Sequence, residues 1–163
     1  MQRRLVLMRH AKSSWKQGNL SDHERPLNGR GRGDAPRMGH ELAARGWVPG
    51  LVASSDSQRT RETWARMCEP LGIPDQDVLW SNHLYLAGLR AIRRHALDWD
   101  GSTTTALVLG HNPGWSDAAS ALSGRPVDMT TGNCALLVGA GATWTEALLR
   151  PWELVGLLRP REL

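Results

Sequence analysis

The chain has 163 residues, 40% of them hydrophobic and 22% charged, which is the composition of an ordinary globular protein. Its formal net charge of +4 at pH 7 comes almost entirely from Arg, but these residues are scattered among Asp and Glu and form no basic stripe of the kind that binds nucleic acid. No stretch is apolar enough for a membrane span or a signal peptide, and Cys68 and Cys134 are too few for a disulfide framework or a metal site. We therefore expect one domain, residues 1–163, in the reducing cytoplasm, with neither nucleic acid nor membrane as a partner.

The first predicted element is a strand, Leu5-Val6-Leu7-Met8, because four apolar residues in a row are typical of a strand buried on both faces. Its carboxyl end carries a cation and an imidazole, Arg9 and His10. In open α/β sheets, this end of the strands is where ligands bind. The 10–28 segment that follows has no clear periodicity, and long loops in compact proteins are usually functional or disordered. Its position beside His10 indicates a binding loop.

The middle of the chain predicts helices and strands in alternation. The run Gly29-Arg30-Gly31-Arg32-Gly33 follows no strand and lacks the dinucleotide-binding spacing, so we do not interpret it as a nucleotide loop. A helix with Met38 and Leu42 on its inner face should follow it and end at Gly46. The next expected elements are a strand at 51–54, a helix at 57–69 stopped by Pro70, an edge strand at 78–80 and a helical segment at 86–99.

In the last third we expect a strand at 104–109 and a helix at 113–122 that Gly124 ends. Residues 135–138 and 143–149 resemble a closing pair of strands around Gly139-Ala140-Gly141. The alternation of helices and strands predicts an α/β fold, a three-layer αβα sandwich with a mainly parallel central sheet.

Three of the predicted strands end at polar clusters that hold an Arg or a His. The 51–54 strand leads to Arg59 and Arg61, and the 104–109 strand leads to His111. Each cluster alone has an ordinary explanation, since Ser55 and Asn112 are common helix caps and an Arg-His pair often lies on the surface. Cations in the first turn of a helix, however, face the positive end of its dipole, and a bound anion would reverse that penalty. We therefore expect the clusters to converge on one anion site.

The chemistry of such a site follows from its residue types. Two guanidinium groups, Arg9 and Arg59, can hold a phosphoryl group bidentately. One imidazole can attack phosphorus, and the second, if protonated, can stabilise the developing charge. Sulfate or carboxylate would bind to similar groups but would need no nucleophile. The sequence contains no cluster of metal ligands, so we expect neither a metal nor another cofactor.

These motifs, in this order across residues 5–115, resemble the histidine phosphatase superfamily. The hallmarks are the Arg9-His10 pair after the first strand, the turn and helix start at 54–63, and His111 after a later strand. The resemblance implies a phosphoglycerate mutase-like fold, with His10 as the phosphorylated nucleophile. It also implies phosphoryl binding by Arg9, Arg59 and His111.

Within that superfamily, the short chain and the run Arg25-Pro26-Leu27-Asn28 resemble the small SixA branch, the protein phosphohistidine phosphatases. The chain departs from the wider pattern at Ala11, where many members have Gly. It also has no carboxylate at 81–85, near which larger members carry an acidic proton donor. Asp22 or Glu24 in the long loop could substitute as donor, or either could be a solvated loop charge.

The absence of a dedicated acid bears on the substrate. An alkoxide leaving group needs a proton from the enzyme, whereas a phosphorylated imidazole can take one from solvent. We therefore expect a metal-independent phosphatase that hydrolyses protein phosphohistidine through an intermediate on His10, and a monomer as its assembly state. Two alternatives stay open: a phosphatase for a small phosphomonoester, and a non-catalytic domain that binds phosphorylated ligands.

Overall fold

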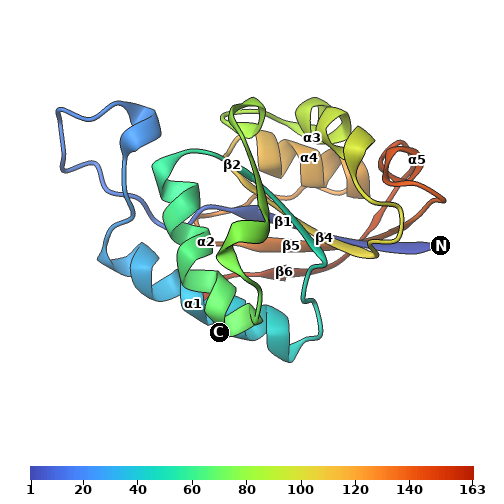
Figure 1. Ribbon diagram of the computed structural model, residues 1–163, viewed down its shortest axis with the longest axis horizontal. Coiled ribbons are helices and arrows are strands. Elements are labelled where there is room, and N and C mark those ends of the chain that lie inside the picture. The colour runs from blue at the N-terminus through green and yellow to red at the C-terminus, as the bar shows by residue number, and fades with distance from the viewer.

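β1 (Gln2–Arg9) lies inside a sheet of six strands whose order is β3-β2-β4-β1-β5-β6 (Figure 1). The computed structural model describes residues 1–163, apart from the side chain of Gln76. The other strands are β2 (Leu51–Ser55), β3 (Val78–Ser81), β4 (Thr105–Gly110), β5 (Cys134–Ala140) and β6 (Glu153–Leu158). The helices are α1 (Gly29–Ala44), α2 (Gln58–Leu71), α3 (Leu89–His95), α4 (Gly114–Ser123) and α5 (Trp144–Leu148), with short 3₁₀ helices at Asp22–Glu24, Asp75–Asp77, Asn82–Leu84, Ala96–Asp98 and Pro160–Glu162.

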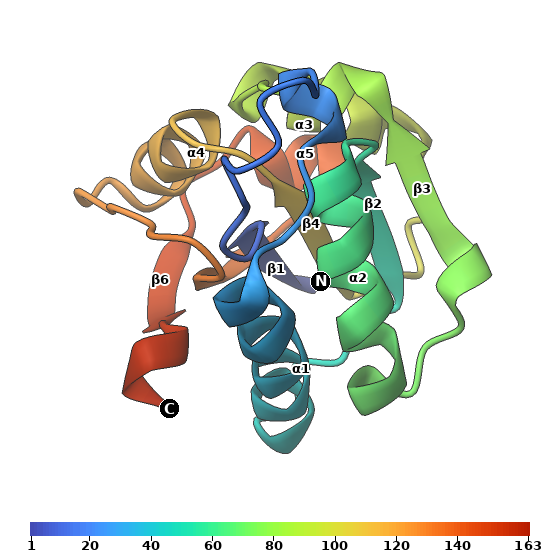
Figure 2. The same ribbon diagram turned by 90° about the vertical axis from the view of Figure 1, so that its left-hand side faces the viewer.

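The sheet is mixed but mostly parallel. β1 pairs in parallel with β4, and β4 and β3 both pair in parallel with β2. β5 runs antiparallel to β1, and β6 runs antiparallel to β5. α1 and α2 lie side by side on one face, whereas α3, α4 and α5 cover the other (Figures 1 and 2). The predicted three-layer αβα sandwich is confirmed.

The core consists of two apolar layers that β1 separates. Leu5 and Leu7 pack into the layer beneath α3, α4 and α5, while Val6 and Met8 pack into the layer beneath α1 and α2. All four side chains are fully buried. The prediction of a strand buried on both faces is therefore correct, and this burial fixes the position of the residues that follow the strand.

α1 begins earlier than the sequence predicted. The Asn28 side chain accepts a hydrogen bond from the Gly31 N–H, so it caps the helix, and the glycine-rich run forms the first turns. A Cβ at Gly31 would lie 2.1 Å from the Lys12 carbonyl oxygen. Only glycine lets the helix start pack this closely against the chain that leaves β1.

The predicted strand at 143–149 is wrong, because this segment forms α5 and the last strand is β6. Thr143 caps α5 by accepting a hydrogen bond from the Glu146 N–H. Trp144, Ala147 and Leu148 are buried at helical spacing. The capping pattern and this spacing outweigh the strand propensity of Thr and Trp in so short a segment.

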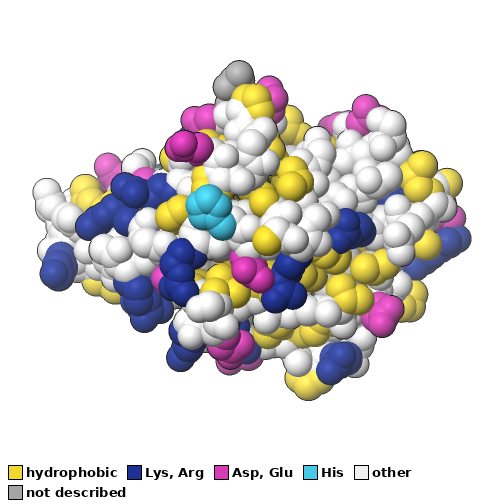
Figure 3. Space-filling view, turned by 90° about the horizontal axis from the view of Figure 1, so that it is seen from below, with side chains coloured by type: hydrophobic (Ala, Val, Ile, Leu, Met, Phe, Trp, Pro, Cys, Tyr) yellow, Lys and Arg dark blue, Asp and Glu magenta, His cyan; other side chains and the backbone are white. Residues whose placement is uncertain are grey.

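The surface carries both signs of charge. Figure 3 shows Lys and Arg side chains interspersed with Asp and Glu on the face seen from below, with more of the positive ones toward one end of the molecule. Along the described chain, no helix combines the length and apolarity needed to cross a membrane.

Candidate active site

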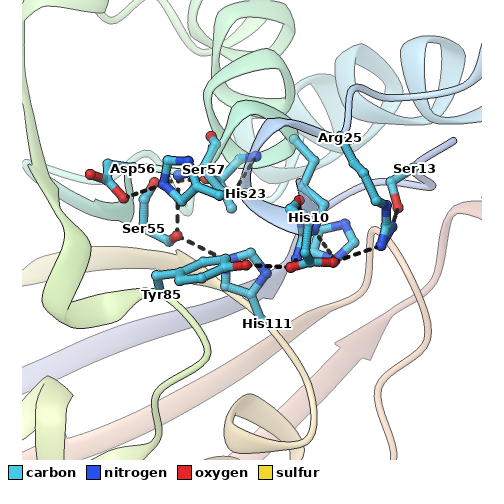
Figure 4. Close-up of polar contacts among 12 residues, drawn as sticks. His10, Ser13, His23, Arg25, Ser55, Asp56, Ser57, Tyr85 and His111 are labelled. Atoms are coloured by element: carbon cyan, nitrogen blue, oxygen red, sulfur yellow. Dashed lines mark hydrogen bonds and ion pairs between the residues drawn. The ribbon is translucent and has the colours of Figure 1, made fainter. Parts of the chain in front are cut away.

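β1 and β4 place two histidines side by side at the carboxyl edge of the sheet. Arg9 pairs with Gly110 in the parallel register, so His10 and His111 each come directly after this pair. The His10 N–H donates to the Gly110 carbonyl oxygen at 3.0 Å. The two ring centroids are 5.3 Å apart, and the side chains are 6% and 1% exposed (Figure 4).

The hydrogen bond of His10 determines which ring nitrogen is free. Nδ1 lies 2.7 Å from the Ala11 carbonyl oxygen, which can only accept, so Nδ1 carries the proton and Nε2 keeps its lone pair. Burial lowers the pKa of His10, and the charges of Arg59, Arg9 and Arg25 lower it further, to about 3, although the bond to Ala11 opposes them. His10 is therefore a neutral base with Nε2 available at physiological pH.

His111 has the complementary arrangement. Its Nε2 lies 2.8 Å from Ser55 Oγ, whereas its buried Nδ1 has no hydrogen-bond partner among the described residues. Burial, followed by the charges of His10 and Arg59, lowers the pKa of His111 to about 2. The imidazole is thus neutral. We assign it the tautomer in which the Ser55 hydroxyl donates to Nε2, so that Nδ1 carries the proton and is the free donor. The protonated second imidazole considered from the sequence is not required.

Arg59 reaches the site from the first turn of α2, whose start Ser57 caps. The guanidinium is buried, and its Nε–H lies 3.4 Å from His10 Nε2. Its Nη1 donates to the Asp22 carbonyl oxygen at 2.6 Å, and its Nη2 donates to Asp22 Oδ2 at 2.9 Å. An anion beside this helix start is the arrangement that the dipole argument predicts, and here the anion is a carboxylate of the chain itself.

Asp22 connects the long loop to the rest of the site. Its carboxylate accepts hydrogen bonds from Arg59, from the Tyr85 hydroxyl, and from Arg25 Nη1 at 3.0 Å. Burial acts to raise the pKa of Asp22, but the bonds from Tyr85 and Arg59 and the charges of Arg59 and Arg25 outweigh it and hold the pKa at about 2. Asp22 is therefore ionised at neutral pH and carries no proton to donate in this arrangement.

Arg9 also lines the site, with His10 and His111. Its Nη1 donates to the Met129 carbonyl oxygen at 3.1 Å, while its buried Nε has no partner among the described residues. The described part of the chain contains three such unpartnered buried side-chain nitrogens, and two of them are Arg9 Nε and His111 Nδ1. Buried donors without partners are costly, so a ligand oxygen that accepts from either of them would be stabilising.

A cavity of about 290 Å³ brings together Arg9, His10, Arg59, His111 and Asp22. Its remaining lining residues are Lys12, Ser13, Trp15, Arg25, Leu86, Asn112 and Thr131. Glu24 does not line it, because the Glu24 carboxylate accepts bonds from Ser21 at the start of its own 3₁₀ helix. Arg61 is also absent from the lining, since it donates to the Asp56 carbonyl oxygen and lies over the Trp80 ring.

The sequence did not predict that three residues would contact the other groups of the site: Tyr85, Arg25 and Ser55. Tyr85 packs edge-on against His111 with ring centroids 5.3 Å apart (Figure 4). No local pattern marks it, because a segment distant in sequence brings it to Asp22. Ser55 could have been found as the last residue of a buried strand, where a hydroxyl faces the same edge as the histidines.

The fold and the site together are those of an α/β protein that binds an anion at the carboxyl edge of its sheet. A mainly parallel sheet carries two neutral imidazoles and a set of guanidinium groups around an anion-sized cavity at its carboxyl edge. Among the described residues, no group of three or more His, Cys, Asp or Glu side chains is placed to hold a metal ion.

Comparison with known proteins identifies the family. Residues 5–81 match the histidine phosphatase superfamily (branch 1). An uncharacterized chloroplastic protein of Arabidopsis thaliana is 40% identical over 97% of this chain and 78% of its own length. The chain therefore belongs to the histidine phosphatase superfamily, as the sequence motifs predicted.

Solved structures place the chain near one branch of that superfamily. A proposed phosphohistidine phosphatase SixA from Nakamurella multipartitia is 27% identical, with a TM-score of 0.84 over 98% of this chain and 97% of that one. Its counterpart from Agrobacterium tumefaciens is 25% identical, with a TM-score of 0.81 over 97% and 98% of the two chains. The phosphoglycerate mutase-like fold and the SixA-like character are thus confirmed, and the class of activity is that of a phosphatase.

Proposed function

We propose that this protein hydrolyses phosphohistidine in proteins, with His10 as the nucleophile. The observation that carries the proposal is the state of His10, a neutral imidazole whose Nδ1–H is bonded to the Ala11 carbonyl and whose Nε2 faces the cavity shared with Arg59 and His111. A phospho-ligand binding domain would need the guanidinium groups but would gain nothing from a neutral imidazole whose Nε2 keeps its lone pair, engaged only by the long 3.4 Å contact with Arg59 Nε.

The first step forms a bond between His10 Nε2 and phosphorus and breaks the phosphorus–nitrogen bond of the substrate. The departing imidazole takes a proton, and the phosphoryl group stays on His10. Arg9, Arg59 and the Nδ1–H of His111 bind the equatorial oxygens, whose charge rises in the transition state. Water then attacks phosphorus, the bond to Nε2 breaks, and inorganic phosphate leaves.

The ionised Asp22 favours this substrate over an alkyl phosphomonoester. A carboxylate that is bonded to Arg59, Arg25 and Tyr85 cannot give a proton to an alkoxide at neutral pH. An imidazole leaving group needs no such donor, because solvent protonates its free ring nitrogen. General acid catalysis contributes roughly 10²–10⁴-fold, so its absence penalises the alkyl ester by about that factor.

Rapid quench with a labelled phosphohistidine protein tests the proposal. The wild type should yield a phosphoenzyme that is labile in acid and stable in alkali, and His10→Ala should lose both label and turnover. His40→Ala serves as the control, since His40 is exposed on α1. His111→Ala should slow labelling without abolishing it. Near-normal turnover by His10→Ala, or label on His111, would refute the assigned roles.

A substrate panel separates this proposal from its alternatives. Phosphohistidine protein, an aryl phosphate and a sugar phosphate should be turned over in that order of preference. A preference for the sugar phosphate would instead assign the chain to small phosphomonoesters. Tight binding of inorganic phosphate without turnover of any of the three would indicate a binding domain.

A further inference from the structure

A second cavity, of about 580 Å³, lies beside α3. We call it the α3 cavity. It is lined by Ser81, His83 and Gly88 from the segment before the helix, and by Arg90, Arg94 and His95 with Ala91 from α3 itself. None of the roles assigned above uses it.

The lining of the α3 cavity is cationic. Arg90 and Arg94 are one helical turn apart and exposed, and neither forms an ion pair with the described residues. Like charges at this spacing destabilise a helix by about 0.2–0.5 kcal/mol. No Asp or Glu belongs to the described lining, and Asp98, whose charge acts on His95, lies outside it. A bound anion would turn this repulsion into attraction.

His95 adds a neutral donor to the same cavity. The Trp99 indole N–H donates to His95 Nδ1 at 2.9 Å, so Nδ1 is the acceptor and Nε2 carries the proton. Burial is the main cause of the lowered pKa of His95, which keeps this tautomer neutral. The cavity therefore offers two guanidinium groups and an imidazole N–H, a set suited to carboxylates.

One segment of the chain, residues 81–88, contributes to both the α3 cavity and the catalytic cavity, although no residue lines both. Ser81 and His83 line the α3 cavity, whereas Leu86 lines the catalytic one, and Tyr85 donates a hydrogen bond to Asp22, which lines the catalytic cavity as well. α3 and the blue segment that contains the 3₁₀ helix Asp22–Glu24 both lie along the upper side of the molecule in Figures 1 and 2, separated along its long axis in Figure 1. A protein ligand long enough to follow the 81–88 segment would therefore contact both cavities.

The rim of the catalytic cavity indicates that such a ligand is a protein. Trp15 is 73% exposed and Leu86 is 59% exposed, although both are large and apolar. Exposed Trp and unpaired Arg are the residue types that contribute most to protein–protein binding.

We propose that the α3 cavity binds acidic side chains of the protein that carries the phosphohistidine, through Arg90, Arg94 and His95. This inference rests on the proposed function and adds to it a charge preference for the substrate. Complementary charges at the edge of a contact mainly raise the rate of association and fix the orientation of the partner.

The test uses two phosphohistidine peptides that differ only in charge, one with four Glu residues flanking the phosphohistidine and one with Gln at the same positions. The wild type should turn over the Glu peptide with a kcat/KM about three- to tenfold higher, and salt should remove the difference. Arg90→Ala/Arg94→Ala should lose the preference while hydrolysing free phosphohistidine at the wild-type rate. Arg90→Lys/Arg94→Lys should restore most of it.

The matched control is Arg66→Ala/Arg161→Ala, which removes the same charge from exposed positions outside both cavities and should keep the preference. Equal kcat/KM for the two peptides in the wild type, or a preference that survives in Arg90→Ala/Arg94→Ala, would overturn the inference alone. Failure of the wild type to hydrolyse any phosphohistidine compound would overturn the proposed function and this inference together.

Discussion

Replacing Ser55 with Ala removes one hydroxyl and tests how His111 is oriented. Ser55 is fully buried, and its Oγ lies 2.8 Å from His111 Nε2. Without this donor, Nε2 is left as a buried unsatisfied acceptor, at a cost of about 1–3 kcal/mol. Moving the ring proton to Nε2 would not remove this cost, because Nε2–H would then lack an acceptor, and the ring would also lose the Nδ1–H that the phosphoryl group needs.

At about 1.4 kcal/mol for each factor of ten, the loss corresponds to a kcat/KM lower by about 5- to 150-fold. The assay is single-turnover hydrolysis of phosphohistidine protein, with vanadate binding measured in parallel. Both should weaken in Ser55→Ala, and Ser55→Thr should recover part of each.

Ser54→Ala is the matched control, because its hydroxyl is equally buried in β2 but donates to the Ser55 carbonyl oxygen and not to His111. A Ser55→Ala enzyme within twofold of the wild type would refute the reasoning. A loss of the same size in Ser54→Ala would show that the effect comes from β2 and not from the tautomer of His111.

Three further predictions concern charge, protonation and packing. Asp22→Asn removes the carboxylate that competes with a bound phosphate for Arg59. Inorganic phosphate should therefore bind several-fold more tightly, as measured by calorimetry. Weaker binding would mean that Asp22 chiefly positions Arg59. His10 and His111 have lower pKa values in the folded chain than in the unfolded one, so between pH ~6.5 and ~3 the unfolded chain binds more protons than the folded chain. The free energy of unfolding should therefore drop as the pH falls through this range, by up to ~2.7 kcal/mol per pH unit. His111→Asn should reduce this slope. Gly31→Ala should destabilise the chain by about 1–3 kcal/mol in denaturant titrations. Gly33→Ala is the control and should stabilise the chain, because nothing lies within 4 Å of the added Cβ. Equal effects of the two substitutions would contradict the packing argument.

The sequence predicted the parts of the fold that local patterns encode. Runs such as Leu5-Val6-Leu7-Met8 read as buried strands because each face of the strand meets its own apolar layer. The 143–149 segment was misassigned because it is short and contains residues that favour strands, while its buried positions follow helical spacing. β6 was missed because its exposed and half-buried residues alternate weakly at the edge of the sheet.

The residues of the candidate site also differ in whether local sequence patterns could predict them. His10 and His111 could be placed from sequence because each directly follows a strand whose carboxyl end is a known ligand edge, and Arg59 because it lies in the first turn of the helix after such a strand. Tyr85 could not, because its contact with Asp22 joins two irregular segments that are 63 residues apart. The ionised state of Asp22 likewise depends on a three-dimensional set of donors that no spacing in the chain reveals.

The position of β1 in the sheet has a consequence for biosynthesis. β1 is made first, yet its neighbours β4 and β5 start at residues 105 and 134. At about 5–20 residues per second, a ribosome needs roughly 5–20 s after Arg9 to reach Gly110. During that interval the apolar residues of β1 have no strand to pair with, so the nascent chain is exposed to misfolding and to capture by chaperones. The pocket around His10 is therefore completed late in synthesis, and a nascent chain that stops before β5 cannot form the sheet that holds it.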